Sequence, residues 1–265
     1  MSVLTVANLS ATLSGKRVVD GVSLVVGKGS VTGLIGPNGA GKSTFLRACL
    51  GLVPASGTLH LDGVNLTALK PSERARHLAY LPQERETAWA MSVEAVVALG
   101  RLPHHARFAA PSQRDEAAIE AALVRMDLIP FRHRAVTSLS GGERARVLIA
   151  RALAQETPVL LADEPLAGLD PHHQIALMRL FRELAAEGRI VIASMHDLTL
   201  AARWCDCLLL LHGGRGHATG LPEAVLTART LEDVYSVEAF IGAAASGLIV
   251  QPVDLSQKKD ENDHG

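Results

Sequence analysis

The sequence predicts an α/β fold with a mixed sheet core, an N-terminal antiparallel β portion and an inserted helical subdomain. Three observations support this prediction. Apolar runs at 159–162 and 190–194 flank a helical pattern near 171–187, which is the rhythm of a βαβ unit with a parallel sheet. A glycine-rich loop joins a further apolar run, 31–35, to a helical pattern. The segment from about 84 to 140 is rich in helix formers.

The remaining elements can be placed in chain order. The runs that predict the antiparallel portion lie at 3–9, 22–26 and 57–61. In the helical segment, Ser92 and Ser112 precede helical patterns at 92–101 and 112–126, because a serine hydroxyl caps the first turn of a helix. A further helix is expected at 141–154.

These elements fit one domain. At 265 residues the chain can bury a substantial core, and we expect a single domain over residues 1–245. Its core is expected at about 1–83 and 157–245, with the helical subdomain at about 84–156 between the two halves. Residues 246–265 form a C-terminal extension that we expect to be partly disordered, since 257–265 is charged and lacks apolar residues.

The loop after the strand at 31–35 carries the strongest chemical signal, because it matches the phosphate-binding pattern G-x-x-x-x-G-K-[ST]. Its glycines let the backbone turn its N–H groups toward phosphate oxygens, and the following helix N-terminus adds roughly half a positive charge. Lys42 is expected to reach the β- and γ-phosphates, and the Ser43 hydroxyl to ligate Mg²⁺. The loop consists of Gly36, Pro37, Asn38, Gly39, Ala40, Gly41, Lys42, Ser43 and Thr44.

An acidic pair follows the apolar strand at 159–162. A buried parallel strand that ends in Asp163 and Glu164 places charge at the sheet edge where α/β proteins bind ligands. We expect Asp163 to complete the Mg²⁺ shell, mostly through water. Glu164 is then free to orient or deprotonate an attacking water. Taken alone, Asp-Glu-Pro could also be an ordinary acidic turn at the end of a strand. The intact phosphate loop favours the functional interpretation.

Three further features lie between or after these anchors. Gln83 follows a short apolar run, and His196 ends the strand at 190–194. A neutral imidazole can donate a hydrogen bond to a γ-phosphate, but a lone histidine or glutamine is more often structural or simply surface, so both interpretations stay open on the residues alone. The turn Leu139-Ser140-Gly141-Gly142-Glu143 opens a helix and predicts a second anion site, centred on Ser140, Gly141 and Gly142.

In this order the motifs resemble those of the nucleotide-binding subunit of ABC transporters, over about residues 3–240. The matching parts are the Walker A loop 36–44, the Q-loop Gln83, the ABC signature 139–143, Walker B 159–165, the D-loop 166–170 and the switch histidine His196. The family's signature is most often LSGGQ, and Glu143 stands in the last place here; related importers are often similar.

The resemblance implies a function for each motif. ATP and Mg²⁺ are the expected ligands, with Glu164, His196, Lys42 and Gln83 in catalysis and Ser43, Gln83 and Asp163 at the metal. In the family two subunits hold two ATP molecules head to tail. Ser140, Gly141 and Gly142 of one subunit, together with Asp170, would therefore complete the site formed by the P-loop of a second copy of the chain.

Composition agrees with a transporter subunit that works beside separate membrane proteins. With 26 basic and 27 acidic side chains and a net charge of −1, nothing indicates a nucleic-acid surface. Three cysteines, Cys49, Cys205 and Cys207, suit a reducing cytoplasm. No signal peptide or apolar run of about 20 residues is found, so we expect a peripheral protein on the cytoplasmic face of the plasma membrane. Its expected partners are integral permease subunits and, indirectly, a periplasmic or extracellular substrate-binding protein.

The segment Gly100-Arg101-Leu102-Pro103-His104 points to a substrate class. It resembles the Gly-Arg-x-Pro-His segment common in ATPases of iron–siderophore, haem and cobalamin importers, which implies import of a metal chelate. The alternative is ordinary helix termination by basic residues and proline. An importer for another substrate class, a soluble ABC-type ATPase and a non-hydrolysing regulatory module stay open, although the intact Glu164 and His196 argue against the last.

A second position, besides Glu143, departs from the family. The aromatic residue that stacks on adenine falls on Leu13, and no Phe, Tyr or Trp precedes Phe45. Stacking of a base on an aromatic ring contributes about 1–3 kcal/mol. Without it we predict weak base discrimination, so that GTP is hydrolysed almost as readily as ATP. Parallel kinetics with both nucleotides test this, and an ATP preference above about tenfold, or roughly 1.4 kcal/mol, would contradict it.

Overall fold

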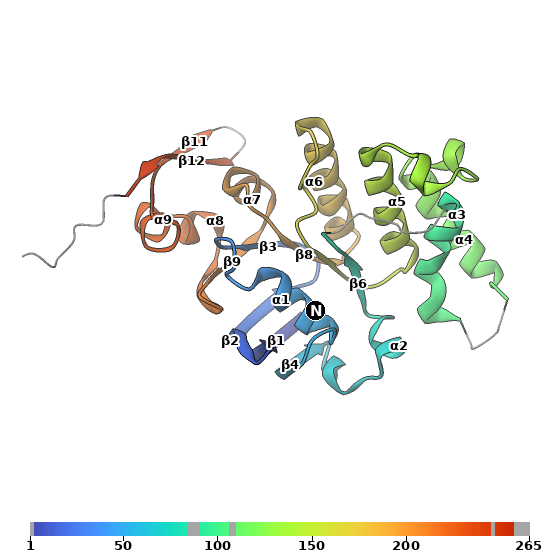
Figure 1. Ribbon diagram of the computed structural model, residues 1–265, viewed down its shortest axis with the longest axis horizontal. Coiled ribbons are helices and arrows are strands. Elements are labelled where there is room, and N and C mark those ends of the chain that lie inside the picture. The colour runs from blue at the N-terminus through green and yellow to red at the C-terminus, as the bar shows by residue number, and fades with distance from the viewer. Residues whose placement is uncertain (1–2, 84–90, 106–109, 245–246, 257–265) are drawn as a thin grey trace, which may run out of the picture.

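The computed structural model describes residues 3–83, 91–105, 110–244 and 247–256. They form an antiparallel sheet, a largely parallel sheet, a helical subdomain and a C-terminal hairpin (Figure 1). The strands are β1 Val3–Leu13, β2 Lys16–Gly27, β3 Ser30–Ile35, β4 Ala55–Leu61, β5 Val64–Asn65, β6 Leu78–Leu81, β7 Val159–Ala162, β8 Ile190–Ser194, β9 Cys207–His212, β10 Arg215–Gly220, β11 Val237–Ala244 and β12 Gly247–Leu255. The α-helices are α1 Lys42–Leu50, α2 Pro71–Arg74, α3 Val93–Ala98, α4 Gln113–Arg125, α5 Gly141–Ala154, α6 Pro171–Ala186, α7 Leu198–Trp204, α8 Pro222–Val225 and α9 Ala228–Tyr235.

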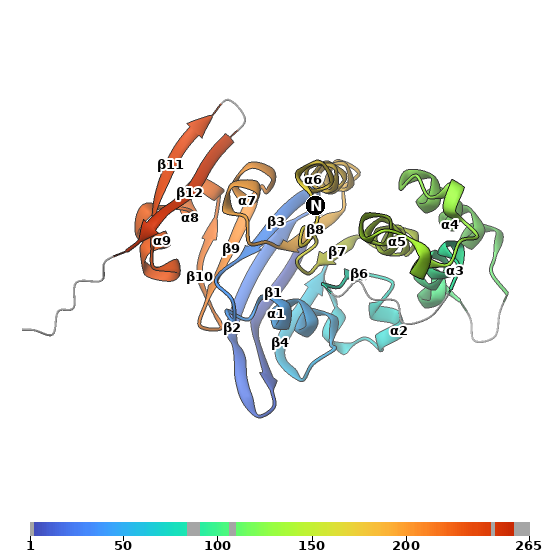
Figure 2. The ribbon, with the colours of Figure 1, turned by 45° about the horizontal axis from the view of Figure 1, so that its top comes forward.

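The predicted fold class is confirmed. The antiparallel sheet has the strand order β2-β1-β4-β5, and the second sheet has the order β10-β9-β3-β8-β7-β6. Strands β3, β6, β7, β8 and β9 pair in parallel, with β10 antiparallel at one edge. Helix α1 lies between the two sheets, while α6 and α7 cover the opposite face of the larger one (Figure 2).

Apolar burial explains this layering. One cluster of buried residues joins the antiparallel sheet to α1, through Phe45 and Leu46, and to one face of the larger sheet. A second cluster joins the other face to α6, α7 and the helical subdomain. The larger sheet is therefore buried on both sides, which is why β7, β8 and most of β9 read as unbroken apolar runs.

The helical subdomain consists of α3, a 3₁₀ turn η2 Leu99–His104, α4 and α5. Serine caps start its helices where the sequence predicts them, because the Ser92 hydroxyl accepts from the Ala95 N–H and that of Ser112 from the Asp115 N–H. Among the helices in the described ranges, none has the length and apolar character needed to cross a bilayer.

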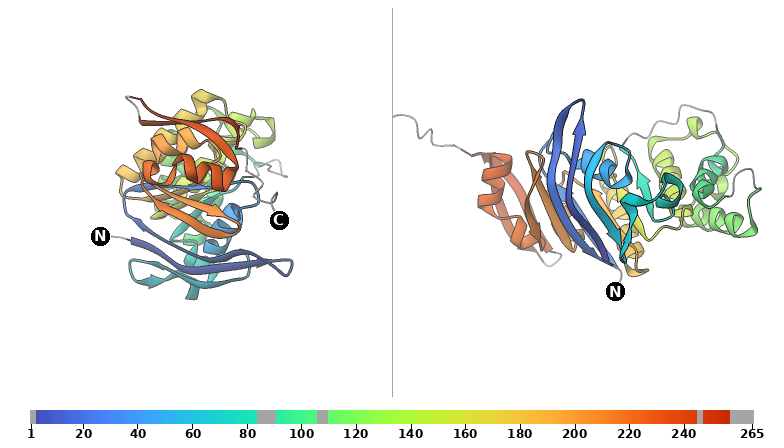
Figure 3. Two further views of the ribbon diagram at one scale, coloured as in Figure 1. Left: turned by 90° about the vertical axis from the view of Figure 1, so that its left-hand side faces the viewer. Right: turned by 90° about the horizontal axis from the view of Figure 1, so that it is seen from below.

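The C-terminal region contains an element that the sequence did not predict. Residues 247–255, expected only as an extension, form β12, which pairs with β11 in an antiparallel hairpin. The Thr199 hydroxyl ties β12 to α7 by donating to the Val250 carbonyl at 2.8 Å and accepting from its N–H at 3.1 Å. This hairpin and the helical subdomain lie at opposite ends of the molecule (Figure 3). The predicted disordered tail at 257–265 lies outside the described residues.

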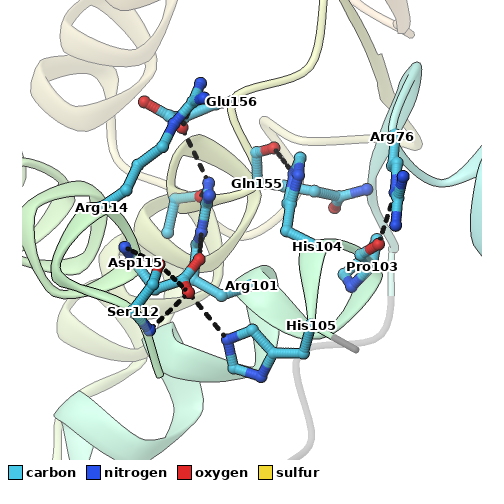
Figure 4. A network of polar contacts seen from close by, with 11 residues as sticks. Arg76, Arg101, Pro103, His104, His105, Ser112, Arg114, Asp115, Gln155 and Glu156 are labelled. Atoms are coloured by element: carbon cyan, nitrogen blue, oxygen red, sulfur yellow. Dashed lines mark hydrogen bonds and ion pairs between the residues drawn. The ribbon is translucent and has the colours of Figure 1, made fainter. Parts of the chain in front are cut away.

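The segment that resembles a metal-chelate importer motif is a buried junction of the helical subdomain (Figure 4). Arg101 in η2 is 1% exposed. Its guanidinium donates to the Asp115 carboxylate at 2.8 Å, to the Ala154 carbonyl at 2.7 Å and to Glu156 at 2.9 Å. Arg101 thus joins η2 to the first turn of α4 and to the last turn of α5. Hydrogen bonds from Ser112 and Arg101 lower the pKa of Asp115, so this carboxylate stays ionised.

Glycine at position 100 permits the close packing of η2 on α5. A Cβ there would lie 2.2 Å from the Arg151 carbonyl oxygen, so η2 packs directly on the backbone of α5. The same junction reaches the core, because the Gln155 amide donates to the Leu78 carbonyl at 3.0 Å and Arg76 to the Pro103 carbonyl at 2.7 Å. The C-terminal end of α5 is therefore fixed to the start of β6.

Replacing Arg101 should destabilise the protein strongly. Arg101→Met removes three links and leaves the Asp115 charge buried without its guanidinium, a change that typically costs about 3–5 kcal/mol. Urea unfolding measures this cost. The matched control is Arg114→Met, which removes an 81% exposed arginine that pairs with Glu156 in the same network and should change stability by less than about 0.5 kcal/mol. A loss below about 1 kcal/mol for Arg101→Met would contradict the structural importance of this junction.

Candidate nucleotide-binding site

The phosphate-binding loop leaves the carboxyl end of β3 and enters α1. Gly36 and Gly41 have φ values of 146° and 100°, which favour glycine. A Cβ on Gly36 would also lie 2.3 Å from the Leu211 carbonyl oxygen, so the loop passes close to β9. A pocket of ≈ 160 Å³ opens over the loop, and the residues that line it are Val18, Asn38, Gly39, Ala40, Gly41, Lys42, Ser43, Thr44 and Glu164.

Lys42 is held inside this loop. Its side chain is buried, and Nζ donates to the Gly36 carbonyl at 2.6 Å and to the Pro37 carbonyl at 3.1 Å. Burial lowers the pKa of Lys42, and the nearby carboxylates of Glu164 and Asp163 act in the opposite direction. The structure therefore brings the predicted lysine and both predicted acids to the same end of the sheet.

Asp163, which follows β7, is a fully buried carboxylate surrounded by hydroxyl groups. Its Oδ1 accepts from Ser43 Oγ at 2.9 Å and from Ser194 Oγ at 2.8 Å, and its Oδ2 accepts from the Tyr80 hydroxyl at 3.2 Å. Burial raises the pKa of Tyr80, so the phenol keeps the proton that it donates. Sequence reasoning missed Ser194 and Tyr80. Their only signal was position, because both lie at or near the carboxyl end of a core strand.

Glu164 lies between Gln83 and His196, two of the residues that the sequence predicts at the site. Its Oε2 accepts from Gln83 Nε2 at 2.7 Å, and its Oε1 lies 2.7 Å from His196 Nε2. The Glu164 backbone has a φ of 45°, in the left-handed region, which turns its side chain away from the line of β7 and toward the pocket. Gln83 and His196, ambiguous in the sequence, thus converge on the carboxylate assigned to water activation.

The signature residues lie elsewhere on the chain. Ser140 caps α5 and forms a capping box with Glu143, whose carboxylate accepts from the Ser140 N–H at 2.7 Å. Glu143 therefore has a structural function at the position where the family more often has glutamine. Gly142 lines a different cavity, of ≈ 240 Å³, between α5 and α6. The predicted second anion site is separate from the P-loop pocket within one chain.

Asp170 caps α6, the helix on the other side of that cavity. Its carboxylate accepts from the His173 N–H at 3.0 Å, and its other oxygen lies 2.8 Å from the His173 ring. These contacts lower the pKa of Asp170. Asp170 and Ser140 are therefore both helix caps, of α6 and α5, and neither lines the P-loop pocket.

The oxygen-rich end of the site suits a hard cation better than a transition metal. Ser43 and Asp163 supply a hydroxyl and a carboxylate that already contact each other, which matches the ligand preference of Mg²⁺. Among the described residues there is no cluster of three or more His, Cys, Asp or Glu side chains that could hold a metal ion without further ligands.

Comparisons with known proteins agree with this geometry. The sequence profile of the family described as ABC transporter matches residues 19–167. The chain is 43% identical over 254 residues to the cobalamin import ATP-binding protein BtuD of Halobacterium salinarum, covering 94% of this chain and 63% of that protein. It is 44% identical over 244 residues to the hemin import ATP-binding protein HmuV of Pseudomonas entomophila, covering 90% and 94%.

A solved structure described as a metal-chelate type ABC transporter in an inward-facing conformation superposes with a TM-score of 0.82 at 27% identity, covering 97% of this chain and 99% of that one. The fold, the P-loop pocket and these relatives agree, so the chain belongs to the ABC transporter family, as one of its ATP-binding proteins.

Proposed function

We propose that this chain hydrolyses ATP in an ABC importer, as a head-to-tail dimer that drives uptake of a metal chelate through separate permease subunits. The observation that carries the proposal is the placement of Glu164. Its carboxylate lines the P-loop pocket and contacts both Gln83 and His196. A carboxylate held in this way beside a phosphate cradle is suited to hold and activate an attacking water.

The hydrolytic step follows from these positions. Lys42 places positive charge beside the phosphates, and the backbone N–H groups of the loop bind their oxygens. Glu164 orients water in line with the γ-phosphorus and accepts its proton, while His196 donates a hydrogen bond to the charge that develops on the γ-phosphate. When bound, Mg²⁺ would neutralise phosphate charge, and Ser43, Asp163 and Gln83 are the residues that would hold it.

A second copy of the chain supplies the rest of the site. The P-loop pocket opens to solvent and is lined by β2, the loop, the first residues of α1 and Glu164, while Ser140 and Gly141 are exposed at the N-terminus of α5. Backbone N–H groups at a helix N-terminus bind phosphate. The signature of one copy therefore fits the open side of the other copy's P-loop pocket, and closure of the dimer encloses the triphosphate.

The substrate class rests on the relatives and on one segment. The relatives named for cobalamin and hemin import align with 90% or more of this chain, and the solved structure is described as of metal-chelate type. The segment at 100–104, which resembles the importer motif, is joined to the residues before β6 by the hydrogen bond from Arg76 to the Pro103 carbonyl. Strand β6 ends at Leu81, two residues before Gln83. ATPase stimulation in liposomes that contain the cognate permease, with haem, cobalamin and iron–siderophore compared, would identify the chelate.

Glu164→Gln should separate binding from hydrolysis. The amide keeps the size of the side chain but cannot accept the proton of water, so hydrolysis should fall by at least about two orders of magnitude. ATP binding should persist, and the variant should accumulate as an ATP-bound dimer in size-exclusion chromatography. Near-normal turnover would remove Glu164 from its proposed role.

The control for this experiment is Glu223→Gln. Glu223 is an exposed residue in the short helix α8, and the substitution makes the same chemical change on the protein surface. It should leave both turnover and the monomer–dimer distribution unchanged in the presence of ATP.

A further inference from the structure

Ser194 occupies the last position of β8, between the two strands that carry the nucleotide site. In the sheet, β8 pairs with β3 on one side, where Leu34 is opposite Ser194, and with β7 on the other, where Ala162 is opposite Ala193. The P-loop follows β3, and Asp163 follows β7. Ser194 is fully buried at this junction.

The Ser194 hydroxyl makes two hydrogen bonds, both to the acidic pair. It donates to Asp163 Oδ1 at 2.8 Å, and it accepts from the backbone N–H of Glu164 at 2.7 Å. A serine hydroxyl has one proton to donate and lone pairs to accept, so one group satisfies both demands. The donor and the acceptor lie on consecutive residues beyond the end of the β7–β8 ladder, so the hydroxyl extends the contact between the two strands by one step.

The hydrogen bond from the Glu164 N–H to the Ser194 hydroxyl acts on a residue with a strained backbone. Glu164 has a φ of 45°, a conformation that non-glycine residues adopt only when their surroundings enforce it. The hydrogen bond from its N–H to Ser194 fixes the peptide that leads into this turn. The direction of the Glu164 carboxylate, between Gln83 and His196, depends on that turn.

We propose that Ser194 is a positioning residue for hydrolysis, which holds the Glu164 backbone in its left-handed conformation and so aims its carboxylate at the attacking water. This inference rests on the proposed function of Glu164. Ser194 does not line the nucleotide pocket, and Asp163 also accepts hydrogen bonds from Ser43 and Tyr80, which do not involve Ser194. Loss of the Ser194 hydroxyl should therefore affect the water-activating step more than ATP binding.

A neighbouring residue provides a comparison for a purely structural role. Thr32 lies on β3, the strand next to β8, and is as fully buried as Ser194. Its hydroxyl has no hydrogen-bond partner among the described residues. A buried hydroxyl in this part of the sheet is thus compatible with folding without any partner, whereas that of Ser194 is bonded on both sides.

The test compares Ser194→Thr with Ser194→Val. The two side chains have nearly the same shape and add the same bulk, but only threonine keeps the hydroxyl. We expect kcat of the valine variant to be about 10- to 100-fold below that of the threonine variant, since small misplacements of a catalytic group have effects of this size. The dissociation constant for ATP should differ by less than about threefold between them. Relative to the unchanged protein, Ser194→Ala, which adds no bulk, should likewise lower kcat about 10- to 100-fold. It should change the dissociation constant for ATP by less than about threefold.

A second readout does not depend on turnover. The Glu164 amide should exchange its hydrogen at least about tenfold faster in Ser194→Val than in Ser194→Thr, because only the latter retains its acceptor. Thr32→Val is the matched control, and its kcat should stay within about twofold of the unchanged protein because no hydrogen bond is lost.

Two results would overturn the proposal. One is equal kcat, within about twofold, with and without the hydroxyl at position 194. The other is a loss of kcat that is matched by an equal loss of ATP affinity, which would mean a general structural defect. Failure of the proposed function is distinguishable, because it would appear as normal turnover of Glu164→Gln while the exchange of the Glu164 amide still responded to Ser194.

Discussion

The structure depends on how one buried charge is accommodated. Asp163 lies at the carboxyl end of β7 with its side chain out of solvent, and a carboxylate in that position is costly unless its oxygens are hydrogen-bonded. Three hydroxyls meet this need, from Ser43 in α1, Ser194 in β8 and Tyr80 in β6. The three hydroxyls and Asp163 come from α1, β6, β8 and the end of β7, so satisfying the charge also fixes the relative positions of the P-loop, the acidic pair and the strand that leads to the Q-loop.

A second constraint acts on helix α5, which begins with the signature residues. The C-terminal end of α5 is fixed by the Arg101 network and by Gln155, while its N-terminal end, with Ser140 and Gly141, is exposed. Next to that free end lies the cavity between α5 and α6. The helix is therefore anchored to the strand that precedes Gln83 and presents its phosphate-binding end outward. In the proposed dimer, such an arrangement would transmit a change at the nucleotide to the helical subdomain and present half of the composite site to the second copy.

Much of the fold could be predicted from the sequence, because its signals are local. The P-loop spacing, the serine caps and the unbroken apolar strands each follow from a few adjacent residues, and α5 spans the predicted residues 141–154. Strand β2 is longer than the predicted run at 22–26, since its first part carries charged residues on the exposed side of an antiparallel sheet. The strand β12 was missed because its exposed residues mix apolar and polar types without a clear alternation.

The site could be predicted less completely, for a physical reason. Ser194 and Tyr80 act through contacts with a residue far along the chain, and a single hydroxyl at a strand end has no spacing pattern that reveals its partner. Arg101 resembled a basic residue at a helix end, but its partner Asp115, in the first turn of the next helix, holds it in the interior. Pairings between distant positions are decided by the packed fold and not by local sequence.

The central claim is that the P-loop of one copy and the signature of another form a single site. Cross-linking tests it most directly, because Asn38 and Gly141 are both exposed. Chains with Asn38→Cys are mixed with chains with Gly141→Cys, both carrying Glu164→Gln, and treated with a short bismaleimide with and without ATP. If the two motifs form one site, a covalent dimer should form in the mixture, require ATP and be absent when either chain is treated alone. No cross-link in the mixture, or one that is indifferent to ATP, would contradict it.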